Sequence, residues 1–159
     1  MIKALVTGAT GFIGHYLVRE LKKRGYWVRA TGTKSNKYTN EADDFKKANL
    51  VNYLDCYRVI GNIEIVFHLA ANIGGIKFIS ENESMIMHDN VIMDMNMIDA
   101  ASKLNVKKFF YPSNRKTFAI FIFFVCRVGI QVAIKPKTST TTKTASKIYH
   151  SILTGKWET

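Results

Sequence analysis

Short apolar segments alternate along residues 1–113 with longer stretches whose apolar positions recur at helical spacing. Five short segments predict strands, and the first of them, residues 2–6, is apolar enough to be buried on both faces of a sheet. The predicted strands cover residues 2–6, 26–32, 47–51, 64–71 and 106–113. The predicted helices cover residues 12–24, 53–60 and 83–104. The polar segment 35–47 predicts a loop that holds one short helix at most.

This order of elements predicts an α/β fold. Strands that alternate with helices are joined by right-handed crossovers, which place the strands in a parallel sheet with helices on both faces. With 159 residues, of which 47% are hydrophobic, the chain is long enough for one core and too short for two ordinary domains. We therefore expect one doubly wound domain over residues 1–114.

The character of the sequence changes after Asn114. Residues 118–126 read "FAIFIFFVC", nine apolar residues in a row, and a second apolar stretch after Arg127 leads into the low-complexity "KPKTSTTTKT". Nine residues are well short of the roughly 20 that span a bilayer. A buried strand, a membrane segment and a disordered or non-native segment all stay open here. We treat 115–143 as an atypical apolar and basic segment, and 144–159 as a separate remnant.

Three glycines stand where the first predicted strand passes into the first predicted helix, in "VTGATGFIG". A side chain at Gly8 or Gly11 would block a tight turn and the approach of the backbone to a pyrophosphate, while Gly14 lets helix and strand pack closely. The N-terminus of the helix then offers N–H groups and the positive end of its dipole to the anion. This placement predicts a dinucleotide site in a Rossmann-type fold.

The end of the second predicted strand bears on which dinucleotide binds. This place commonly holds a carboxylate for the ribose hydroxyls of the adenosine. Here the sequence reads "ATGTKSN", with Gly32 followed by Thr33, Lys34 and Ser35. Hydroxyl and basic groups suit a 2′-phosphate and favour NADP, whereas a Lys34 that is simply solvated leaves NAD open. The predicted cofactor is NAD or NADP.

The formal net charge is +11, and most of it lies in residues 115–159, where eight Lys or Arg accompany one acidic residue. No aromatic-flanked basic motif or recognition-helix pattern goes with these charges, so we expect neither nucleic acid nor a membrane as partner. Cys56 and Cys126 show no metal-binding spacing, so we expect no metal. Residues 1–12 are too briefly apolar for a signal peptide, and we expect a cytoplasmic location.

Several motifs together resemble one family. The glycine spacing, "VFHLAA", "DNVIMDMNMIDAA" and "VKKFFYPS" are similar to the extended short-chain dehydrogenases/reductases, the NAD(P)-dependent epimerases and dehydratases of nucleotide sugars. The stretch "HLAANIGGIKFISENESMIMHDN" resembles the GDP-mannose 3,5-epimerase branch of that family. The resemblance implies a nucleotide-sugar substrate like GDP-mannose, a homodimer as one option, and removal of a hydride from a sugar carbon followed by its return.

The resemblance also implies the residues of the site. Those around the dinucleotide would be Gly8, Gly11, Phe12, Ile13, Gly14, Asn49, Leu50, Ala70 and Ala71. Those around the sugar would be Gly74, Gly75 and Phe78. Purely structural roles stay open for several of them: Asn49 can cap a turn, the alanines can be small because helices pack on them, and the two adjacent glycines can form a flexible loop.

Two further groups of residues have a structural interpretation. His68 lies in an apolar strand, and we predict a buried, hydrogen-bonded core residue rather than a base. The methionines of the third predicted helix are predicted to be adaptable core packing rather than part of a cofactor site. They are Met85, Met87, Met93, Met95 and Met97.

The sequence departs from the family after Ser113, which the resemblance assigns to orienting the sugar hydroxyl. Members continue to a Tyr-x-x-x-Lys motif, whereas "KTASK" has Lys143 in place of the tyrosine and Lys147 in place of the catalytic lysine. A cationic lysine cannot accept the hydroxyl proton, so we predict little or no turnover. Two compensating reading-frame changes, or an unspliced segment, over residues 115–143 would explain the departure. Residues 144–159 would then be a remnant that resembles the family's helix after the Tyr-x-x-x-Lys motif. Cys126 lies outside the cysteine motif of the GDP-mannose branch, and no role is transferred to it.

Two functions follow from these observations. The first is an NAD(P)-dependent nucleotide-sugar epimerase/dehydratase, GDP-mannose 3,5-epimerase-like, that is truncated and impaired because the tyrosine and the half that closes over the sugar are missing. The alternative is a non-catalytic NAD(P)-binding or regulatory module, which the missing tyrosine favours.

Overall fold

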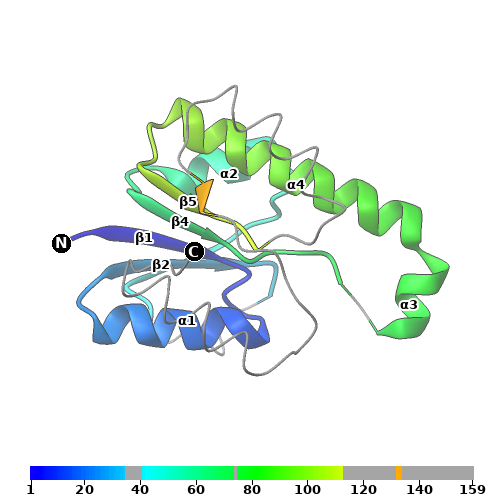
Figure 1. Ribbon diagram of the computed structural model, residues 1–159, viewed down its shortest axis with the longest axis horizontal. Coiled ribbons are helices and arrows are strands. Elements are labelled where there is room, and N and C mark those ends of the chain that lie inside the picture. The colour runs from blue at the N-terminus through cyan, green and yellow to red at the C-terminus, as the bar shows by residue number, and fades with distance from the viewer. Residues whose placement is uncertain (35–40, 74, 113–131, 134–159) are drawn as a thin grey trace.

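A computed structural model describes residues 1–34, 41–73, 75–112 and 132–133 of the chain. Its centre is a sheet of six strands, all paired in parallel, in the order β3-β2-β1-β4-β5-β6 (Figure 1). The strands are β1 (Lys3–Thr7), β2 (Trp27–Gly32), β3 (Asp44–Lys47), β4 (Ile65–His68), β5 (Lys108–Phe110) and β6 (Val132–Ala133). The predicted doubly wound parallel sheet is confirmed.

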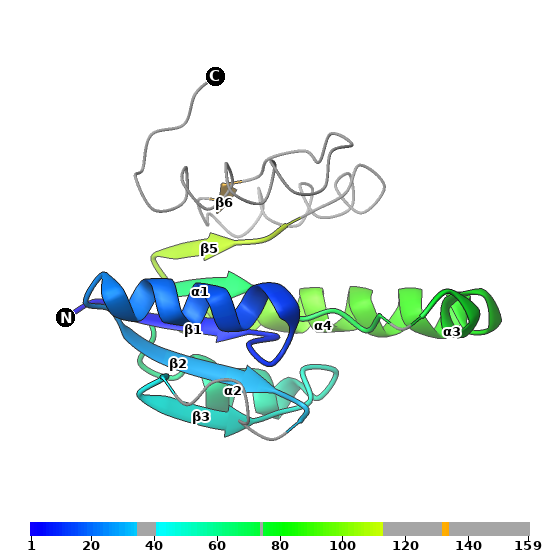
Figure 2. The same ribbon diagram turned by 90° about the horizontal axis from the view of Figure 1, so that it is seen from below.

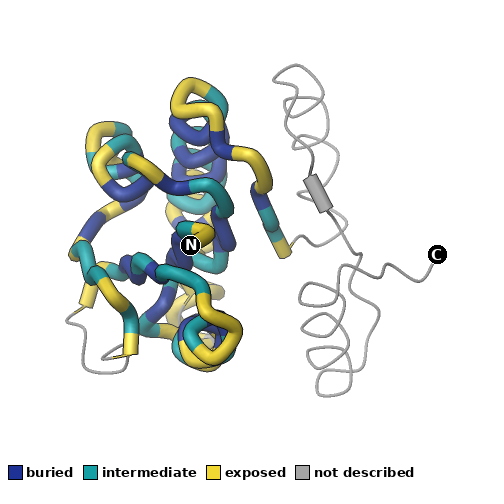
Figure 3. The backbone as a smooth tube through the Cα atoms, turned by 90° about the vertical axis from the view of Figure 1, so that its left-hand side faces the viewer, coloured by how far each residue is buried: buried dark blue, intermediate teal, exposed yellow. Residues whose placement is uncertain are grey.

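Helices cover both faces of the sheet, α1 on one face and α2 with α4 on the other (Figures 1 and 2). The helices are α1 (Phe12–Lys23), α2 (Tyr53–Ile60), α3 (Ile76–Glu81) and α4 (Glu83–Lys103). Alternate residues of β1 pack on opposite helices: Leu5 belongs to the core beneath α2 and α4, and Ala4 and Val6 to the core beneath α1. The central strands β1, β2 and β4 and the inner sides of the helices are accordingly the most buried parts of the described chain (Figure 3).

The third strand lies elsewhere than predicted. The sequence suggested a strand at 47–51 and a loop at 35–47, whereas β3 begins at Asp44 within that predicted loop. Polar contacts to β2 fix this register: Asp43 accepts a hydrogen bond from the Val28 N–H at 2.7 Å, and Arg29 Nε donates to Asp44 at 2.6 Å. An edge strand held by such contacts does not need an apolar sequence, so hydrophobicity did not reveal it.

The methionine prediction holds for only part of α4. Met93 and Met97 are buried in the core and Met95 is half-buried, but Met85 and Met87 are exposed, at 46% and 65%. The cause is position, since the N-terminal part of α4 and the short α3, which the sequence did not predict, extend past the end of the sheet (Figure 2). Among the described residues, the core cluster beneath α4 includes helix residues only from Met93 onward. Met93 also lines the cleft at the ends of the strands, so it is not core packing alone.

The short strand β6 adds to the sheet at β5, where Val132 pairs with Phe109. It comes from the second apolar stretch of the atypical segment. Several predictions fall on segments outside the described residues. These segments are "FAIFIFFVC" and the remnant 144–159, and the same holds for Ser113, Cys126, Lys143 and Lys147. Within the described part of the chain, no helix is both long and apolar enough to cross a membrane.

Candidate functional site

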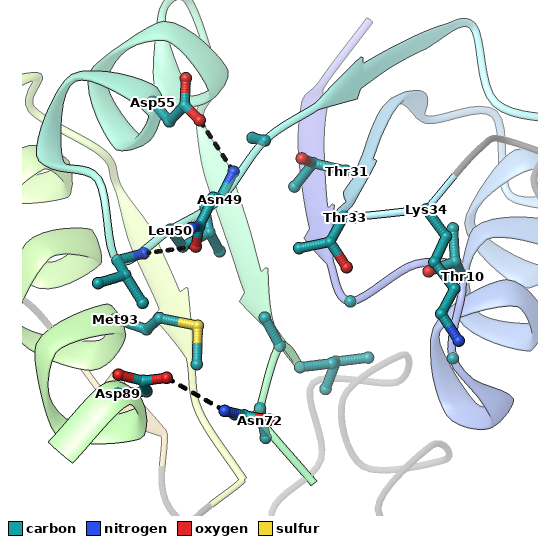
Figure 4. Close-up of a pocket in the computed structure, with 18 of the residues that line it drawn as sticks. Thr10, Thr31, Thr33, Lys34, Asn49, Leu50, Asp55, Asn72, Asp89 and Met93 are labelled. Carbon is teal, nitrogen blue, oxygen red and sulfur yellow. Dashed lines mark hydrogen bonds between the residues drawn. The ribbon is translucent and has the colours of Figure 1, made fainter. Parts of the chain in front are cut away.

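A cleft of about 970 Å³ opens at the carboxyl ends of the strands (Figure 4). The segments that follow β1, β2, β3 and β4 form most of its lining, and α4 contributes from one side. The lining side chains and backbone include Gly8, Thr10, Gly11, Thr33, Lys34, Asn49, Leu50, Ala70, Ala71, Asn72, Asp89 and Met93. In open parallel sheets this edge is where ligands bind.

The glycine turn brings the segment after β1 close to the segment after β4. Gly8 has φ +63°, and a Cβ there would lie 2.8 Å from the Leu69 carbonyl oxygen and 2.9 Å from the Ala70 nitrogen. A Cβ on Gly14 would lie 2.3 Å from the Gly8 carbonyl oxygen. Any side chain at either position would therefore push the backbone apart. Close packing at Gly14 was expected and is present, although the helix packs there on the turn residues Gly8 and Ala9 rather than on the strand itself.

The N-terminus of α1 faces the cleft without a side-chain cap. Gly11 is the N-cap residue and has no side chain to accept a hydrogen bond, and the first turn of α1 holds no acidic residue. The first N–H groups of a helix lack intrahelical partners and carry the positive end of the helix dipole. This end of the cleft is therefore suited to a phosphate group.

The structure brings part of the predicted set together in the cleft. The lining includes six of the nine residues assigned to the dinucleotide: Gly8, Gly11, Asn49, Leu50, Ala70 and Ala71. Phe12, Ile13 and Gly14 are not among the lining residues, and the Phe12 side chain is 79% exposed on α1. Their assigned contacts with the pyrophosphate stay predictions.

The two described residues assigned to the sugar, Gly75 and Phe78, are not part of the cleft lining. Gly75 is the N-cap residue of α3, and Phe78 lies on α3 with 40% of its surface exposed. Gly74 lies outside the described residues. The two described residues share a short helix beyond the end of the sheet, and their assignment to the sugar stays a prediction.

Asn49 has a structural role whether or not a ligand is present. Its side-chain oxygen accepts a hydrogen bond from the Val51 N–H at 3.2 Å, as the turn-capping interpretation predicted. Its own N–H donates to Asp55 at 2.8 Å, and this bond, together with Arg58, lowers the pKa of the Asp55 carboxyl. These bonds fix the loop that carries Asn49 and Leu50 along the cleft.

Sequence reasoning missed the contact between α4 and the loop after Ala71. The Asn72 N–H donates to the Asn90 side chain at 2.6 Å, and the Asn72 amide donates to Asp89 at 3.1 Å (Figure 4). Asn90 returns a hydrogen bond to the Asn72 carbonyl. The adjacent Asp89 and Asn90 in α4 were the available signal, because polar residues need hydrogen-bond partners if they face the interior.

The basic side of the cleft is at the ends of β2 and β3. Thr33 and Lys34 follow β2, and Lys47 ends β3. Figure 4 shows Lys34 beside Thr10, on the other side of the cleft from Asp89 and Met93. The residues that the sequence linked to a 2′-phosphate therefore do line the cleft, except Ser35, which lies outside the described residues.

A buried chain of polar side chains runs behind the cleft. His68 is 1% exposed, and its Nδ1 lies 2.9 Å from Thr7 Oγ1 while its Nε2 lies 3.1 Å from Asp94. The other oxygen of Asp94 accepts a hydrogen bond from the Tyr111 hydroxyl at 2.5 Å. The prediction of His68 as a buried, hydrogen-bonded core residue is confirmed.

Cys56 is the one cysteine within the described residues, and it is free and buried. Burial raises the pKa of its thiol to about 12, and the thiol donates to the Leu50 carbonyl at 3.3 Å. The described part of the chain also holds no group of three or more side chains that could bind a metal ion.

Comparison with known proteins places these features in a family. The sequence profile of the NAD dependent epimerase/dehydratase family matches residues 4–121, and the chain belongs to this family. Among its relatives, the GDP-mannose 3,5-epimerase of Arabidopsis thaliana is 39% identical over 116 residues, and GDP-mannose 3,5-epimerase 1 of Oryza sativa subsp. indica is 37% identical over 116 residues. The family resemblance seen in the sequence is confirmed.

The matches extend over part of the relatives only. The aligned region is 71% of this chain but 31% of the Arabidopsis thaliana protein. Among solved structures, UDP-glucose 4-epimerase of Thermotoga maritima with UDP-glucose has a TM-score of 0.73 at 20% identity, over 84% of this chain and 54% of that one. UDP-glucose 4-epimerase of Brucella ovis in complex with NAD has a TM-score of 0.75 at 14% identity, over 86% and 51%.

These structural matches show a shared fold. The family description names NAD, in agreement with the predicted cofactor class of NAD or NADP. The assignment of individual residues to that cofactor depends on the cleft itself.

Proposed function

We propose that the cleft binds NAD or NADP, with the pyrophosphate at the turn from Gly8 to Gly11. The observation that carries this proposal is the glycine turn at the N-terminus of α1, which lies close to the backbone of Ala70. Because the turn has no side chains at Gly8 and Gly11, it exposes backbone rather than side chains to the anion. Asn49 and Leu50 would flank the adenine, and Ala70 and Ala71 would face the rest of the dinucleotide. Membership of an NAD dependent family supports this use of the cleft.

The activity we propose for the whole protein is a nucleotide-sugar epimerase or dehydratase of the GDP-mannose 3,5-epimerase kind. The similarity to two plant GDP-mannose 3,5-epimerases supports this choice of substrate. The bound dinucleotide would supply hydride acceptance and return. Ser113 would orient the sugar hydroxyl, and Lys147 would lower the pKa of a proton acceptor beside it.

This chain carries Lys143 where the family has the tyrosine that accepts the proton. An ammonium group has no lone pair for that proton, so turnover would be small or absent. The second candidate function is therefore a non-catalytic NAD(P)-binding or regulatory module, and Lys143 is the observation that favours it. A cytoplasmic location and a homodimer stay predictions.

Titration of the chain with NADH and NADPH, followed by dinucleotide fluorescence, tests both candidates. Binding that changes when GDP-mannose is added supports the enzyme, and binding that ignores the sugar supports the module. Failure to bind either dinucleotide would contradict both.

A pair of tryptophan variants locates the binding site. Ala71 is exposed and lines the cleft, so Ala71→Trp should fill the cleft without disturbing the core and weaken NADH binding at least about tenfold, or about 1.4 kcal/mol. Ser84 is exposed on α4 and does not line the cleft, so Ser84→Trp should leave the Kd unchanged and serves as the matched control. Equal effects of the two variants would contradict the proposed site.

The 2′ substituent can be tested at Lys34. If Lys34 pairs with a 2′-phosphate at the mouth of the cleft, Lys34→Ala should weaken NADPH binding about fivefold, as expected for an exposed ion pair, and leave NADH binding unchanged. Lys77→Ala on the exposed surface of α3 is the control for loss of charge. Equal changes for the two dinucleotides would leave Lys34 without a role in selecting between them.

A further inference from the structure

Four side chains from β1, β4, α4 and the end of β5 form one continuous set of hydrogen bonds, which we call the polar relay. Its members in order are Thr7, His68, Asp94 and Tyr111. The imidazole of His68 also packs on two aromatic rings after α4, at centroid distances of 5.7 Å to Phe109 and 5.9 Å to Tyr111. His68 and Asp94 are both buried, so water does not replace a lost partner easily.

The hydrogen bonds at Thr7 fix the tautomer of His68. Thr7 Oγ1 already accepts from the N–H groups of Leu69 and Ala70, each at 3.0 Å, which occupies both lone pairs of the hydroxyl oxygen. The hydroxyl proton is therefore donated to Nδ1 of His68, and Nδ1 carries no proton. Nε2 carries it instead and donates to Asp94.

The relay ends at the glycine turn of the cleft. Thr7 holds Leu69 and Ala70 in place, and the backbone of these two residues is what Gly8 approaches most closely. At its other end, Tyr111 stands two residues before Ser113. One set of hydrogen bonds thus connects the end of β5 with the wall of the cleft.

We infer that His68, Asp94 and Tyr111 are positioning residues, which hold the Thr7 hydroxyl in one orientation and so fix the Leu69–Ala70 wall of the dinucleotide cleft. The dinucleotide part of this inference rests on the proposed function. None of the three lines the cleft, so an effect on binding would have to pass through Thr7. If the three residues had a purely structural role in the core, replacing them would lower the stability of the domain without a specific effect on hydrogen exchange at the amides of Leu69 and Ala70.

The tautomer is tested by the ¹⁵N chemical shifts of the imidazole in the full 159-residue chain. The chain has four histidines, and the signals missing from His68→Phe identify those of His68. We expect Nδ1 to show the shift of an unprotonated ring nitrogen and Nε2 that of a protonated one near neutral pH. A protonated Nδ1 would overturn the inference.

The positioning role is tested by amide hydrogen exchange in the ligand-free chain and by NADH titration. His68→Phe removes the acceptor for the Thr7 proton and should speed exchange at Leu69 and Ala70 about fivefold relative to Val66, with a similar loss of NADH affinity. Tyr111→Phe removes one donor to Asp94 and should have about a twofold effect of the same kind. It keeps the test decisive if His68→Phe does not fold.

Val59→Ala is the control, because Val59 is buried in α2 and belongs to neither the cleft lining nor the relay. It should lower stability while the relative exchange of Leu69 and Ala70 and the Kd for NADH stay as in the wild type. Unchanged relative exchange in both relay variants would overturn the positioning role. If the wild type binds no NADH, the proposed function fails. The tautomer and exchange measurements still test whether the polar relay positions Leu69 and Ala70.

Discussion

Two tyrosines donate hydrogen bonds to aspartates of α4, one on the outside of the domain and one inside it. Tyr53, at the start of α2, donates to Asp99, whose side chain is 34% exposed. Tyr111, after β5, donates to Asp94, whose side chain is 9% exposed. The chemical pair is the same in both places, and only the surroundings differ.

The surroundings decide what each pair does. Outside, Lys103 pairs with Asp99 at 2.9 Å and donates to the Tyr53 hydroxyl, so the charge is balanced and water can replace any member. Inside, Asp94 depends on His68 and Tyr111 for its hydrogen bonds. We therefore expect the outer pair to join α2 to α4 weakly and the inner pair to contribute more to the stability of the fold.

The largest difference should appear when each aspartate is removed. Asp94→Ala leaves the buried Nε2–H of His68 and the Tyr111 hydroxyl without their acceptor, and it should cost about 3 kcal/mol of unfolding free energy. Asp99→Ala, on the same helix, should lower the urea midpoint much less. Equal shifts in the two midpoints would mean that burial does not distinguish the pairs.

The hydroxyl groups should show a smaller difference of the same sign. Tyr111→Phe removes a hydrogen bond to a buried carboxylate and should cost about 1.5 kcal/mol by urea unfolding. Tyr53→Phe should shift the midpoint less, because water replaces the hydroxyl at the surface of α2. A larger shift for Tyr53→Phe would reverse the ranking of the two pairs.

Both tyrosine hydroxyls should keep part of their contribution to stability above pH 10. The hydrogen bond to Asp99 raises the pKa of Tyr53 to about 12, from 10.0. Its contribution to stability is complete below pH 10 and is lost as the pH rises through about 12, so the difference between wild type and Tyr53→Phe should shrink over that range. Burial, followed by the bond to Asp94, raises the pKa of Tyr111, so the difference for Tyr111→Phe should also persist above pH 10. Urea midpoints measured in a pH series would check both.

The smallest expected effect is at acid pH in the outer pair. The hydrogen bond from Tyr53, helped by Lys103, holds the pKa of Asp99 below its ordinary 3.8. The stability this provides is present above pH 3.8 and is lost as the pH falls through the lowered pKa. The difference between wild type and Asp99→Asn should therefore shrink below pH 3.8, and also in about 1 M salt. A difference that grows toward acid would contradict this assignment.

The sequence predicted most of the sheet because its central strands are apolar and separated by helical periodicity. The helix at 53–60 has the predicted bounds, and α1 and α4 each end one residue earlier than predicted. The strand β3 escaped prediction because its register depends on Arg29, a residue 15 positions away from Asp44. Local hydrophobicity carries no information about such a partner.

The cleft was predictable where geometry demands a residue type. Gly8 and Gly14 leave no room for a Cβ, so glycine spacing revealed them directly. Asn72 and Asp89 could be identified as cleft residues only once the loop after β4 was seen beside α4. Of the polar relay, His68 was predicted to be buried, but its partners come from three other elements and no spacing in the sequence connects them.

The central position of β1 has a consequence for synthesis of the protein. Thr7 leaves the ribosome before its partner Leu69, which follows 62 positions later, so the two sides of the cleft wall cannot form at the same time as β1 is made. Until β4 emerges, β1 can pair only with β2 and has one open edge. Such long-range parallel pairing makes folding slow and leaves the nascent chain exposed to aggregation. A chaperone that shields the open edge of β1 would act during the time between the emergence of β1 and that of β4.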